Sequence, residues 1–556
     1  MKEWTARPGC SERALIEALG VYQSHEVVAT DLLARLCRAR EPGARAYAAG
    51  VAGAWADRLP DPLALLRSLV ADENARVRLQ AVVACTCVPK AEAMEVAAIA
   101  ADLPTDKFLN YALTQAVFAL KPYWLPAFKV GKLNLENKSS RLGLLVRADG
   151  TSDTLQTVRD LLKSVRMDSA AREAYLRILV DTGDANDLAA ILNLSDASLQ
   201  ARVLPALAAD ASVRDVRPAG DLTAALRPLI AGRNSELRAE ALKLAGVWKL
   251  EVFRTDAENI ARDGTASETV RRAAIEALAG LGGERSNAIL TVLAAPEEAV
   301  SVRSAAIAAL SSFDLESAAE FASRSLARLN NGAAFDEIFS SFLHRQGGAA
   351  ALAVALARRP LPKLAAEAGL RLMNAGGRRN DQLARFLADA AGFKSEVKTV
   401  TSAEIAAFAV EVRAHGDARR GAEIFRRADL GCTACHTVNG QGGNVGPDLS
   451  ALGTAQPVDF IIGAILDPQK EVKEGYMSVS VVTKDGEEFQ GYQVRETRGE
   501  LVLRDVLQNK EVRLRRETIK ERKQHGSVMP SGLADTLTRA EFRDLVRFLS
   551  ELGKPR

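Results

Sequence analysis

The sequence predicts a mainly α fold, in which an array of paired helices is followed by a smaller helical domain carrying an antiparallel β insertion. Three observations support this fold class. Aromatic residues make up only 5 % of the 556 residues, so helices are expected to pack through small side chains. A short motif recurs along the first 310 residues, and alternating runs bounded by turn signals begin near residue 476.

The recurring motif is a Val-Arg or Leu-Arg pair followed by alanines. Its last three copies lie about 33 residues apart, a spacing that suits a two-helix repeat stacked into a solenoid. The motif resembles the second helices of HEAT repeats. We therefore expect a HEAT-like helical repeat domain over 1–395, with generic amphipathic helices lacking a regular superhelix as the alternative. The copies lie at 75–82, 236–242, 269–275 and 301–307.

The stretch 111–128 is the most apolar and aromatic part of the repeats. Pro122, Trp124 and Pro126 argue against one unbroken helix there, because an interior proline lacks the N–H of the helical ladder. We expect a corner between repeats, with a docking surface as the alternative.

A different kind of chain begins after a predicted linker at 396–416. Residues 432–436 read Cys-Thr-Ala-Cys-His, the attachment signature of a c-type haem, within a predicted domain at 417–556. The thiols of Cys432 and Cys435 can each add to one vinyl group of a single porphyrin. His436 then lies where its imidazole can bind the iron.

A Cys-x-x-Cys pair has two other common interpretations, a zinc site and a thioredoxin-like redox pair. A zinc site needs further Cys or His ligands at short spacing, and a thioredoxin-like pair should follow a strand and open a helix. Here the motif follows a helical segment and precedes a glycine-rich loop. The remaining cysteines show no metal spacing and are expected to be small packing residues; they are Cys10, Cys37, Cys85 and Cys87.

A second axial ligand is expected from Met529, which lies in an irregular loop before the last helix. Flanking proline and small residues disfavour a packed helical position, and a thioether ligand raises the reduction potential relative to a second histidine. The alternative is a methionine that fills a gap in the core. Rival ligands are Met477, in a strand-like run, and His525, in an expected solvated turn.

Supporting residues are also recognisable around the haem motif. The carbonyl of Pro447 is free to accept a hydrogen bond from the other ring nitrogen of His436, although proline is also an ordinary turn former. Gly421 would allow close approach of two terminal helices. Thr538 and Glu541 form a Thr-x-x-Glu capping box that begins the last helix.

In order, these marks resemble class I cytochromes c, and the resemblance covers roughly 417–553. It is closer to a haem-binding domain of planctomycetes and verrucomicrobia, in which a β insertion splits the cytochrome c core before a Ser-x-Met-Pro-x-Gly-Leu loop. The resemblance implies one covalent haem c held by Cys432 and Cys435. It also implies axial ligation by His436 and Met529, with the Pro447 carbonyl supporting the histidine.

The β insertion is predicted at about 476–520. Alternating runs joined by Lys484-Asp485-Gly486 and other tight turns indicate four or five short antiparallel strands. The residues there show no catalytic pattern, so we expect a structural or partner-facing role. The segments 465–468 and 474–476 also fit the sequence pattern of the haem-binding domain that this region resembles.

Function follows as an expectation from the haem motif. We expect an electron carrier for a partner oxidoreductase or dehydrogenase, with the repeats as docking scaffold. Alternatives are a scaffold whose haem is regulatory or catalytic and a subunit of a sugar-type dehydrogenase. The sequence leaves enzymatic activity uncertain and does not indicate an oligomeric state.

Charge and hydropathy bound the partners and the compartment. With 73 basic and 70 acidic residues, the balance is too even for a nucleic-acid footprint. No run of about 18 apolar residues predicts a membrane span. The first thirty residues lack the apolar core of a signal peptide. Because c-type haem is attached outside the bacterial cytoplasm, we nevertheless expect a periplasmic or otherwise exported protein.

Overall fold

The structure is a computed structural model and confirms the mainly α fold class. It describes residues 2–5, 10–136, 138–163, 168–211, 214, 216–376, 380–393, 401–473, 475–497 and 499–554. Two compact units are present, and each is considered by itself. Unit 1 comprises Met1–Asp210 and Val216–Ala225, and unit 2 comprises Ala211–Asp215 and Leu226–Arg556. The division lies within the expected repeat domain, because the last repeats pack against the carboxyl-terminal segment.

Unit 1 is a stack of helix pairs. Helix α4 packs on α6 and α6 on α8, while α3, α5 and α7 form a second layer against them. The stacking is that of a solenoid, in which each pair contacts its neighbours in sequence. Its helices are α1 (Lys2–Thr5), α2 (Glu12–Ser24), α3 (Thr30–Leu36), α4 (Pro42–Ala54), α5 (Pro62–Leu69), α6 (Ala75–Cys85), α7 (Ala91–Ala98), α8 (Lys107–Lys129), α9 (Ser139–Asp149), α10 (Ser152–Leu162), α11 (Ser169–Thr182), α12 (Ala185–Leu192) and α13 (Ala197–Ala211).

Helix α8 corrects one expectation, because it runs unbroken through Pro122 and Pro126. Both proline rings lie on the exposed side of the helix. The carbonyls that lose their N–H partners there remain open to water, which removes most of the penalty of a buried orphan group. On the opposite side Trp124 is fully buried, and its Nε1 donates to the carbonyl of Val117 at 2.8 Å.

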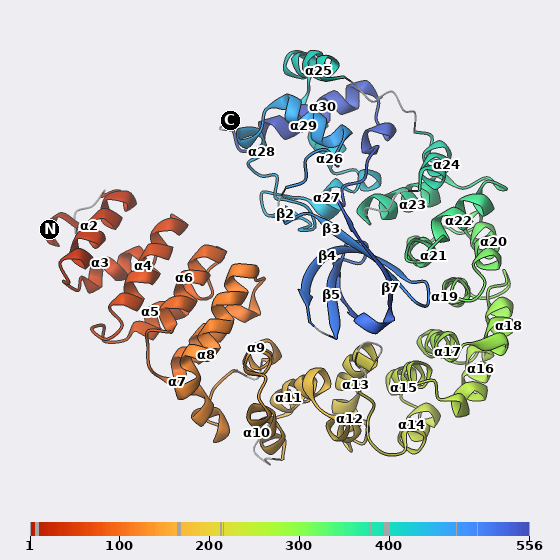
Figure 1. Cartoon of the computed structure of the whole chain (residues 1–556), viewed down its shortest axis with the longest axis horizontal. Coiled ribbons are helices and arrows are strands. Elements are labelled where there is room, and N and C mark those ends of the chain that lie inside the picture. The colour runs from red at the N-terminus through yellow and green to blue at the C-terminus, as the bar shows by residue number, and fades with distance from the viewer. Residues whose placement is uncertain are drawn as a thin grey trace. The chain divides into compact units, whose positions relative to one another are not determined.

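Unit 2 also contains stacked helix pairs, and these confirm the helical-repeat fold. One layer is formed by α15, α17, α19, α21 and α23, each packed on the next. The intervening helices form a second layer against it (Figure 1). The helices are α14 (Leu222–Ala231), which spans the division, α15 (Ser235–Val247), α16 (Arg254–Arg262), α17 (Glu268–Leu281), α18 (Gly283–Leu293), α19 (Val300–Leu310), α20 (Leu315–Leu326), α21 (Gly332–Leu343), α22 (Gly348–Leu356), α23 (Lys363–Ala375) and α24 (Asp381–Ala391).

The arginine of the repeated motif joins neighbouring repeats. Arg271 is 7 % exposed, and its guanidinium donates to the carbonyl of Ala261 at 2.9 Å and to Glu298 at 2.8 Å. Arg78 likewise donates to the carbonyls of Asp72 and Pro104, at 2.7 Å each. The motif therefore buries an aliphatic stem while its planar fork satisfies loop groups of adjacent repeats.

The carboxyl-terminal helices of unit 2 form a separate core, here called the haem-motif module, over 401–473 and 526–554. Helix α26 crosses α30, and α25 packs on α29 and α30. The capping box of Thr538 and Glu541 is present at the start of α30. The elements are α25 (Ser402–His415), α26 (Ala418–Phe425), η3 (Ala428–Leu430), α27 (Cys432–Cys435), β1 (Thr437–Val438), β2 (Gln441–Gly442), α28 (Leu452–Ala455), α29 (Val458–Leu466), η5 (Leu533–Thr536) and α30 (Arg539–Glu551).

The segment expected to be a linker, 396–416, differs from that expectation. Residues 396–400 lie outside the described residues, but Ser402–His415 form helix α25. Phe408 and Val412 are buried in the core of the module, and the Phe408 ring stacks on that of Phe542 at 5.4 Å. A capping box at Thr401 begins this helix, so it is an integral part of the module.

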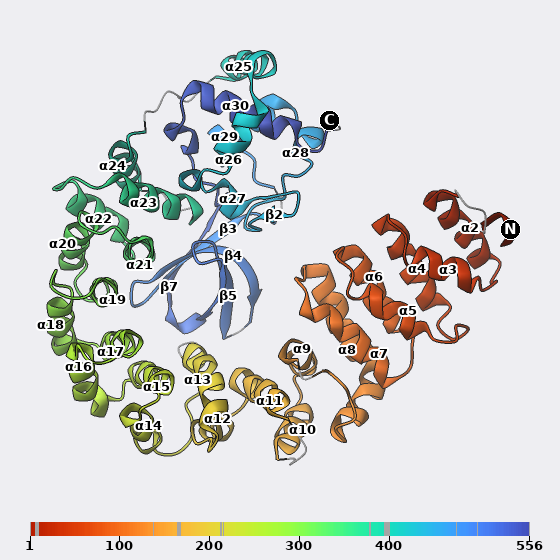
Figure 2. The ribbon, with the colours of Figure 1, turned by 180° about the vertical axis from the view of Figure 1, so that it is seen from behind.

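The β insertion is a curved five-stranded antiparallel sheet with strand order β6-β5-β4-β3-β7 (Figure 2). It runs from Ser478 to His525, so it begins two residues inside the expected range of about 476–520 and ends five residues beyond it. Val481, Leu501 and Leu503 are fully buried in its own small core. Glu474, which belongs to the segment 474–476 of the family pattern, lies outside the described residues. The strands are β3 (Ser478–Thr483), β4 (Glu488–Glu496), β5 (Glu500–Asp505), β6 (Lys510–Arg515) and β7 (Ile519–His525).

Among the helices that the structure describes, none combines the length and the apolar character that crossing a membrane requires.

Candidate functional site

The haem motif forms one tight helical turn. Gly431 precedes it with φ +71°, a left-handed conformation that glycine adopts without strain. Cys432 and Cys435 occupy the two ends of α27, and the backbone N–H of His436 donates to the carbonyl of Cys432 at 2.8 Å. One turn of helix therefore holds both thiols and delivers the imidazole directly after them.

His436 is oriented by the loop that follows it. Its Nδ1 lies 2.8 Å from the carbonyl oxygen of Pro447, the hydrogen bond that the sequence predicts. Burial lowers the pKa of His436, although the bond to Pro447 acts in the opposite direction. A neutral ring with Nδ1–H donating to a carbonyl leaves Nε2 as the nitrogen for a metal.

Glycines let this loop close tightly over the motif, a feature that sequence reasoning missed. A Cβ at Gly446 would lie 2.6 Å from Cε1 and 2.8 Å from Nδ1 of His436. A Cβ at Gly442, where φ is +114°, would collide with the carbonyl oxygen of His436. The backbone of Gly446 also donates to the carbonyl of Cys435 at 2.7 Å. The Gly-rich stretch after the motif was the available signal.

Met529 lies half-buried against the same apolar core that Cys432 contacts. Its loop is fixed by the side chain of Gln469, which accepts from the N–H of Ser527 and donates to the Ser527 carbonyl, both at 3.0 Å. Ser527 in turn accepts from the N–H of Met529 at 3.0 Å. Gln469 was not predicted, because its role depends on a partner segment about 60 residues further along the chain.

The rival ligands occupy other positions. His525 is exposed, as expected, but it ends strand β7 and does not lie in a turn, and its Nε2 hydrogen-bonds to Oγ of Ser480 at 2.7 Å. Met477 directly precedes β3 and is 44 % exposed. Met529 contacts the module core, whereas neither of these residues is part of it.

The thiols differ from those of a redox-active pair. Burial raises the pKa of Cys432 to about 12 and that of Cys435 to about 11. A catalytic Cys-x-x-Cys pair instead lowers the pKa of its attacking thiol. Two closely spaced thiols, an oriented neutral imidazole and a thioether on one apolar core are the donor set that a covalently bound haem requires.

The site is walled on one side by elements outside the module. Sγ of Cys435 lies 3.9 Å from the carbonyl oxygen of Ala375, the last residue of α23. Asn374 donates to the carbonyl of Asp429 at 2.8 Å. On the β insertion, Tyr492 packs with Cys435, and burial raises the pKa of this tyrosine so that its phenol stays protonated at neutral pH.

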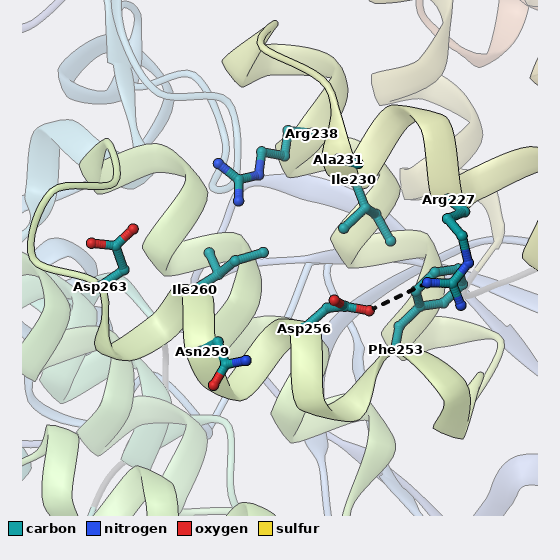
Figure 3. A pocket seen from close by; sticks show the side chains of 9 residues that line it. All are labelled: Arg227, Ile230, Ala231, Arg238, Phe253, Asp256, Asn259, Ile260 and Asp263. Carbon is teal, nitrogen blue, oxygen red and sulfur yellow. Dashed lines mark ion pairs between the residues drawn. The ribbon is translucent and has the colours of Figure 1, made fainter.

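A separate hollow of about 450 Å³ lies among the repeats, between α14 and α16 (Figure 3). Ile230 and Ile260 line its middle, and Arg227 pairs with Asp256 at 4.0 Å on one side. Arg238 reaches in from α15. None of the predicted haem residues contributes to this hollow.

Comparison with known proteins agrees with the site. Residues 418–479 match the family described as Cytochrome c. This segment is therefore a cytochrome c domain, and the family implies a covalently bound haem c. Among curated proteins, none matches the sequence of the chain.

Similar solved structures include those of the karyopherin Kap121p. The structure of Kap121p is 12 % identical with a TM-score of 0.34 over 79 % of this chain and 55 % of that chain. Kap121p bound to the extreme C-terminus of the protein phosphatase Cdc14p is 13 % identical with a TM-score of 0.32, over 65 % and 45 %. The chain thus spans about half the length of these karyopherin chains.

Proposed function

We propose that this protein is a c-type haem electron carrier that exchanges electrons with a partner oxidoreductase. Cys432 and Cys435 would hold one haem through thioether bonds, and His436 and Met529 would supply the axial ligands of its iron. The observation that carries the proposal is the His436–Pro447 hydrogen bond, made directly after a helical turn that holds both thiols. It fixes the ring and its tautomer as an axial ligand needs.

The residues of the chain supply position and environment. Haem, when bound, supplies a one-electron Fe(III)/Fe(II) couple. Pro447 and Gly446 hold the His436 ring, and Gln469 holds the loop of Met529. Cys432 and Met529 pack on the apolar core of the module, which would keep water away from a bound haem. With His436 and Met529 both bound to the iron, the haem would serve one-electron transfer, which requires no proton movement by the chain.

The rest of the chain supports the same role. The repeats are the docking scaffold for a redox partner or dehydrogenase, since stacked helix pairs present extended binding surfaces. The β insertion that interrupts the cytochrome c core supports the finer resemblance to the haem-binding domain of planctomycetes and verrucomicrobia. Covalent attachment of a haem would support a periplasmic or otherwise exported location.

The decisive experiment is the intact mass and absorption spectrum of the protein exported by a host with cytochrome maturation machinery. We expect the mass of one covalent haem and a low-spin spectrum that carbon monoxide does not change. Cys432→Ala with Cys435→Ala should remove the haem. The matched control, Cys85→Ala with Cys87→Ala, should retain it, because those free thiols lie in the repeats. A colourless wild-type protein would overturn the proposal.

Met529→Ala tests the sixth ligand separately. This variant should keep its covalent haem but bind carbon monoxide and show a lower reduction potential. Met477→Ala is the control, because Met477 is exposed and precedes β3. A Met529→Ala spectrum identical with that of the wild type would contradict the ligand assignment.

A further inference from the structure

One small apolar cluster joins the three segments that carry the haem-binding residues. Val445, Val506 and Val528 are 2 %, 3 % and 7 % exposed and pack together, with Cys435 and Tyr492 against them. Val445 precedes the Gly446–Pro447 support of His436, and Val528 precedes Met529. Val506, directly after strand β5, and Tyr492 of β4 come from the β insertion, which therefore touches all three segments.

The position of Val506 is fixed from within the sheet. Its N–H donates to the carbonyl of Gln490 at 3.0 Å. The preceding carboxylate, Asp505, is fully buried and accepts from the N–H of Gln508 at 2.9 Å. Arg504 reaches across and hydrogen-bonds to Asn444 of the loop that holds His436. The carboxyl end of strand β5 is thus bonded to the haem loop as well as packed on it.

The last repeats hold the β insertion from the other side. Nε2 of His344, at the end of α21, lies 3.4 Å from Oδ1 of Asp505. The carbonyl of His344 accepts from the N–H of Glu488 at 2.7 Å, and Arg345 donates to the carbonyl of Asp485 at 2.8 Å. These contacts lie within unit 2 and connect the repeats to Val506 through one buried carboxylate.

We propose that Val506 is a positioning residue for both axial ligands of the haem and that His344 extends this support to the repeats. The proposal rests on the proposed function, because it concerns how His436 and Met529 are held. Val506 keeps the Val445 and Val528 segments together, so the iron's two ligand loops cannot separate independently. Side chains that lie about 160 residues apart along the chain, such as His344 and Asp505, thereby contribute to one haem environment.

The test uses the haem-loaded full chain with Val506→Ala. Removing two methyl groups leaves a cavity between the ligand loops. We expect covalent haem to be retained, the population of ferrous protein that binds carbon monoxide to rise about tenfold, and the reduction potential to fall. Amide hydrogen exchange should speed up in both 444–449 and 526–530, a readout that does not depend on electron transfer.

The matched control is Val481→Ala, which makes the same deletion at a fully buried position in the β insertion's own core. This variant should lower the midpoint temperature of unfolding without making a coordination position on the haem iron available to carbon monoxide. Equal carbon monoxide binding in the two variants would overturn the proposal, because it would indicate general loosening of the sheet. Carbon monoxide binding unchanged from the wild type in Val506→Ala would do the same.

His344→Gln tests the support from the repeats and does not delete core volume. We expect a smaller change of the same kind, with His25→Gln, at an exposed helix end, as control. A His344→Gln protein that matches the wild type would refute the role of the repeats. If wild-type protein carries haem but Val506→Ala has no effect, only this inference fails. If wild-type protein carries no haem, the proposed function fails as well.

Discussion

Glycine brings helices close together both in the repeats and in the haem-motif module. The repeats contain many similar helix crossings, whereas the module contains the single crossing of α26 on α30. In the repeats, a Cβ at Gly246 would lie 2.6 Å from Cα of Ala277, and one at Gly280 would lie 2.7 Å from the carbonyl carbon of Gly246. This crossing of α15 and α17 is one of many similar ones along the stack. In the module, Gly421 lies at the crossing of α26 on α30, against the backbone of Asp544.

This difference predicts how far the structural effect of a substitution extends in each region. A solenoid is stabilised by nearest-neighbour interfaces, so a loosened crossing is a local defect. The module has one core that also orients the haem residues, so a shifted crossing reaches the site. The following predictions test this contrast, from the largest expected effect to the smallest.

Gly421→Ala should have the largest effect. The new Cβ meets backbone atoms of Asp544, and α30 must move. We expect the free energy of unfolding to fall by about 3 kcal/mol or more and the haem spectrum to change. For Gly246→Ala we expect a loss of about 2 kcal/mol and an unchanged haem spectrum. Thermal unfolding followed by circular dichroism and haem absorbance gives both values.

The control for this pair is Gly50→Ala in α4, where the nearest group to a new Cβ is Oε1 of Gln80 at 3.7 Å. It should stabilise the chain by about 0.5–1 kcal/mol, because alanine favours helix over glycine. If Gly246→Ala altered the haem spectrum as much as Gly421→Ala, the proposed contrast between local and shared damage would be wrong.

Arg271→Ala should cost about 2 kcal/mol, because it leaves the carbonyl of Ala261 and the carboxylate of Glu298 without their buried partner. The loss should remain in the repeats, visible as faster amide exchange in α16 to α19 with an unchanged haem spectrum. Arg303→Ala is the comparison within the motif, since the guanidinium of this copy bonds to the carbonyl of Pro296 at an exposed site. Equal losses for the two variants would rule out a special contribution from the buried bonds of Arg271.

Gln469→Ala should cost about 1 kcal/mol, the net worth of ordinary hydrogen bonds at a partly exposed site. Because Gln469 bonds to both Ser527 and Met529, the reduction potential should shift while global stability changes little. Gln441→Ala, at an exposed position of β2, should leave the potential unchanged. A potential that does not move in Gln469→Ala would show that the loop is held by other groups.

The smallest effects concern pH. Burial raises the pKa of Glu487, with repulsion from Asp485 adding to it and Arg345 and His344 opposing it. A carboxyl whose folded pKa is raised contributes stability below the unfolded pKa near 4.3, and this contribution is lost as pH rises through the folded pKa. Glu487→Gln should therefore become more stable relative to the wild type as pH rises.

Glu276 in α17 offers the matched case in the repeats, since burial also raises its pKa, opposed mainly by Lys243 and Arg272. Urea unfolding at pH 4 and pH 7 should show the same trend for Glu276→Gln, but only the Glu487→Gln effect should be seen in the haem signal. The absence of any pH-dependent difference between Glu487→Gln and the wild type would contradict the pKa direction.

Local signals predicted much of the fold. The spacing of the Val-Arg motif indicated stacked helices, and alternation with turn residues indicated the sheet. The chemistry of residues 432–436, the Thr538 cap and the His436–Pro447 bond are short-range features that a sequence displays directly. Each depends on groups that lie within about a dozen residues of each other.

Features that depend on tertiary packing were not predicted. The expected break at Pro122 and Pro126 was wrong because both rings lie on the exposed side of α8, a fact set by packing rather than propensity. Helix α25 has almost no amphipathic pattern, so only its buried Phe408 and Val412 show that it belongs to the module. Asn374 carries no local signal, because its partner Asp429 lies about 55 residues away.

The partial burial of Cys435 against the carboxyl end of α23 has a consequence for biogenesis. An enzyme that joins porphyrin to the chain needs both thiols within reach, yet in the folded unit Ala375 and Tyr492 lie against one of them. We therefore expect the chain to be translocated unfolded and to receive its porphyrin before the final repeats dock. Maturation would then proceed in a fixed order, in which the last repeats dock on the module only after the haem has been attached.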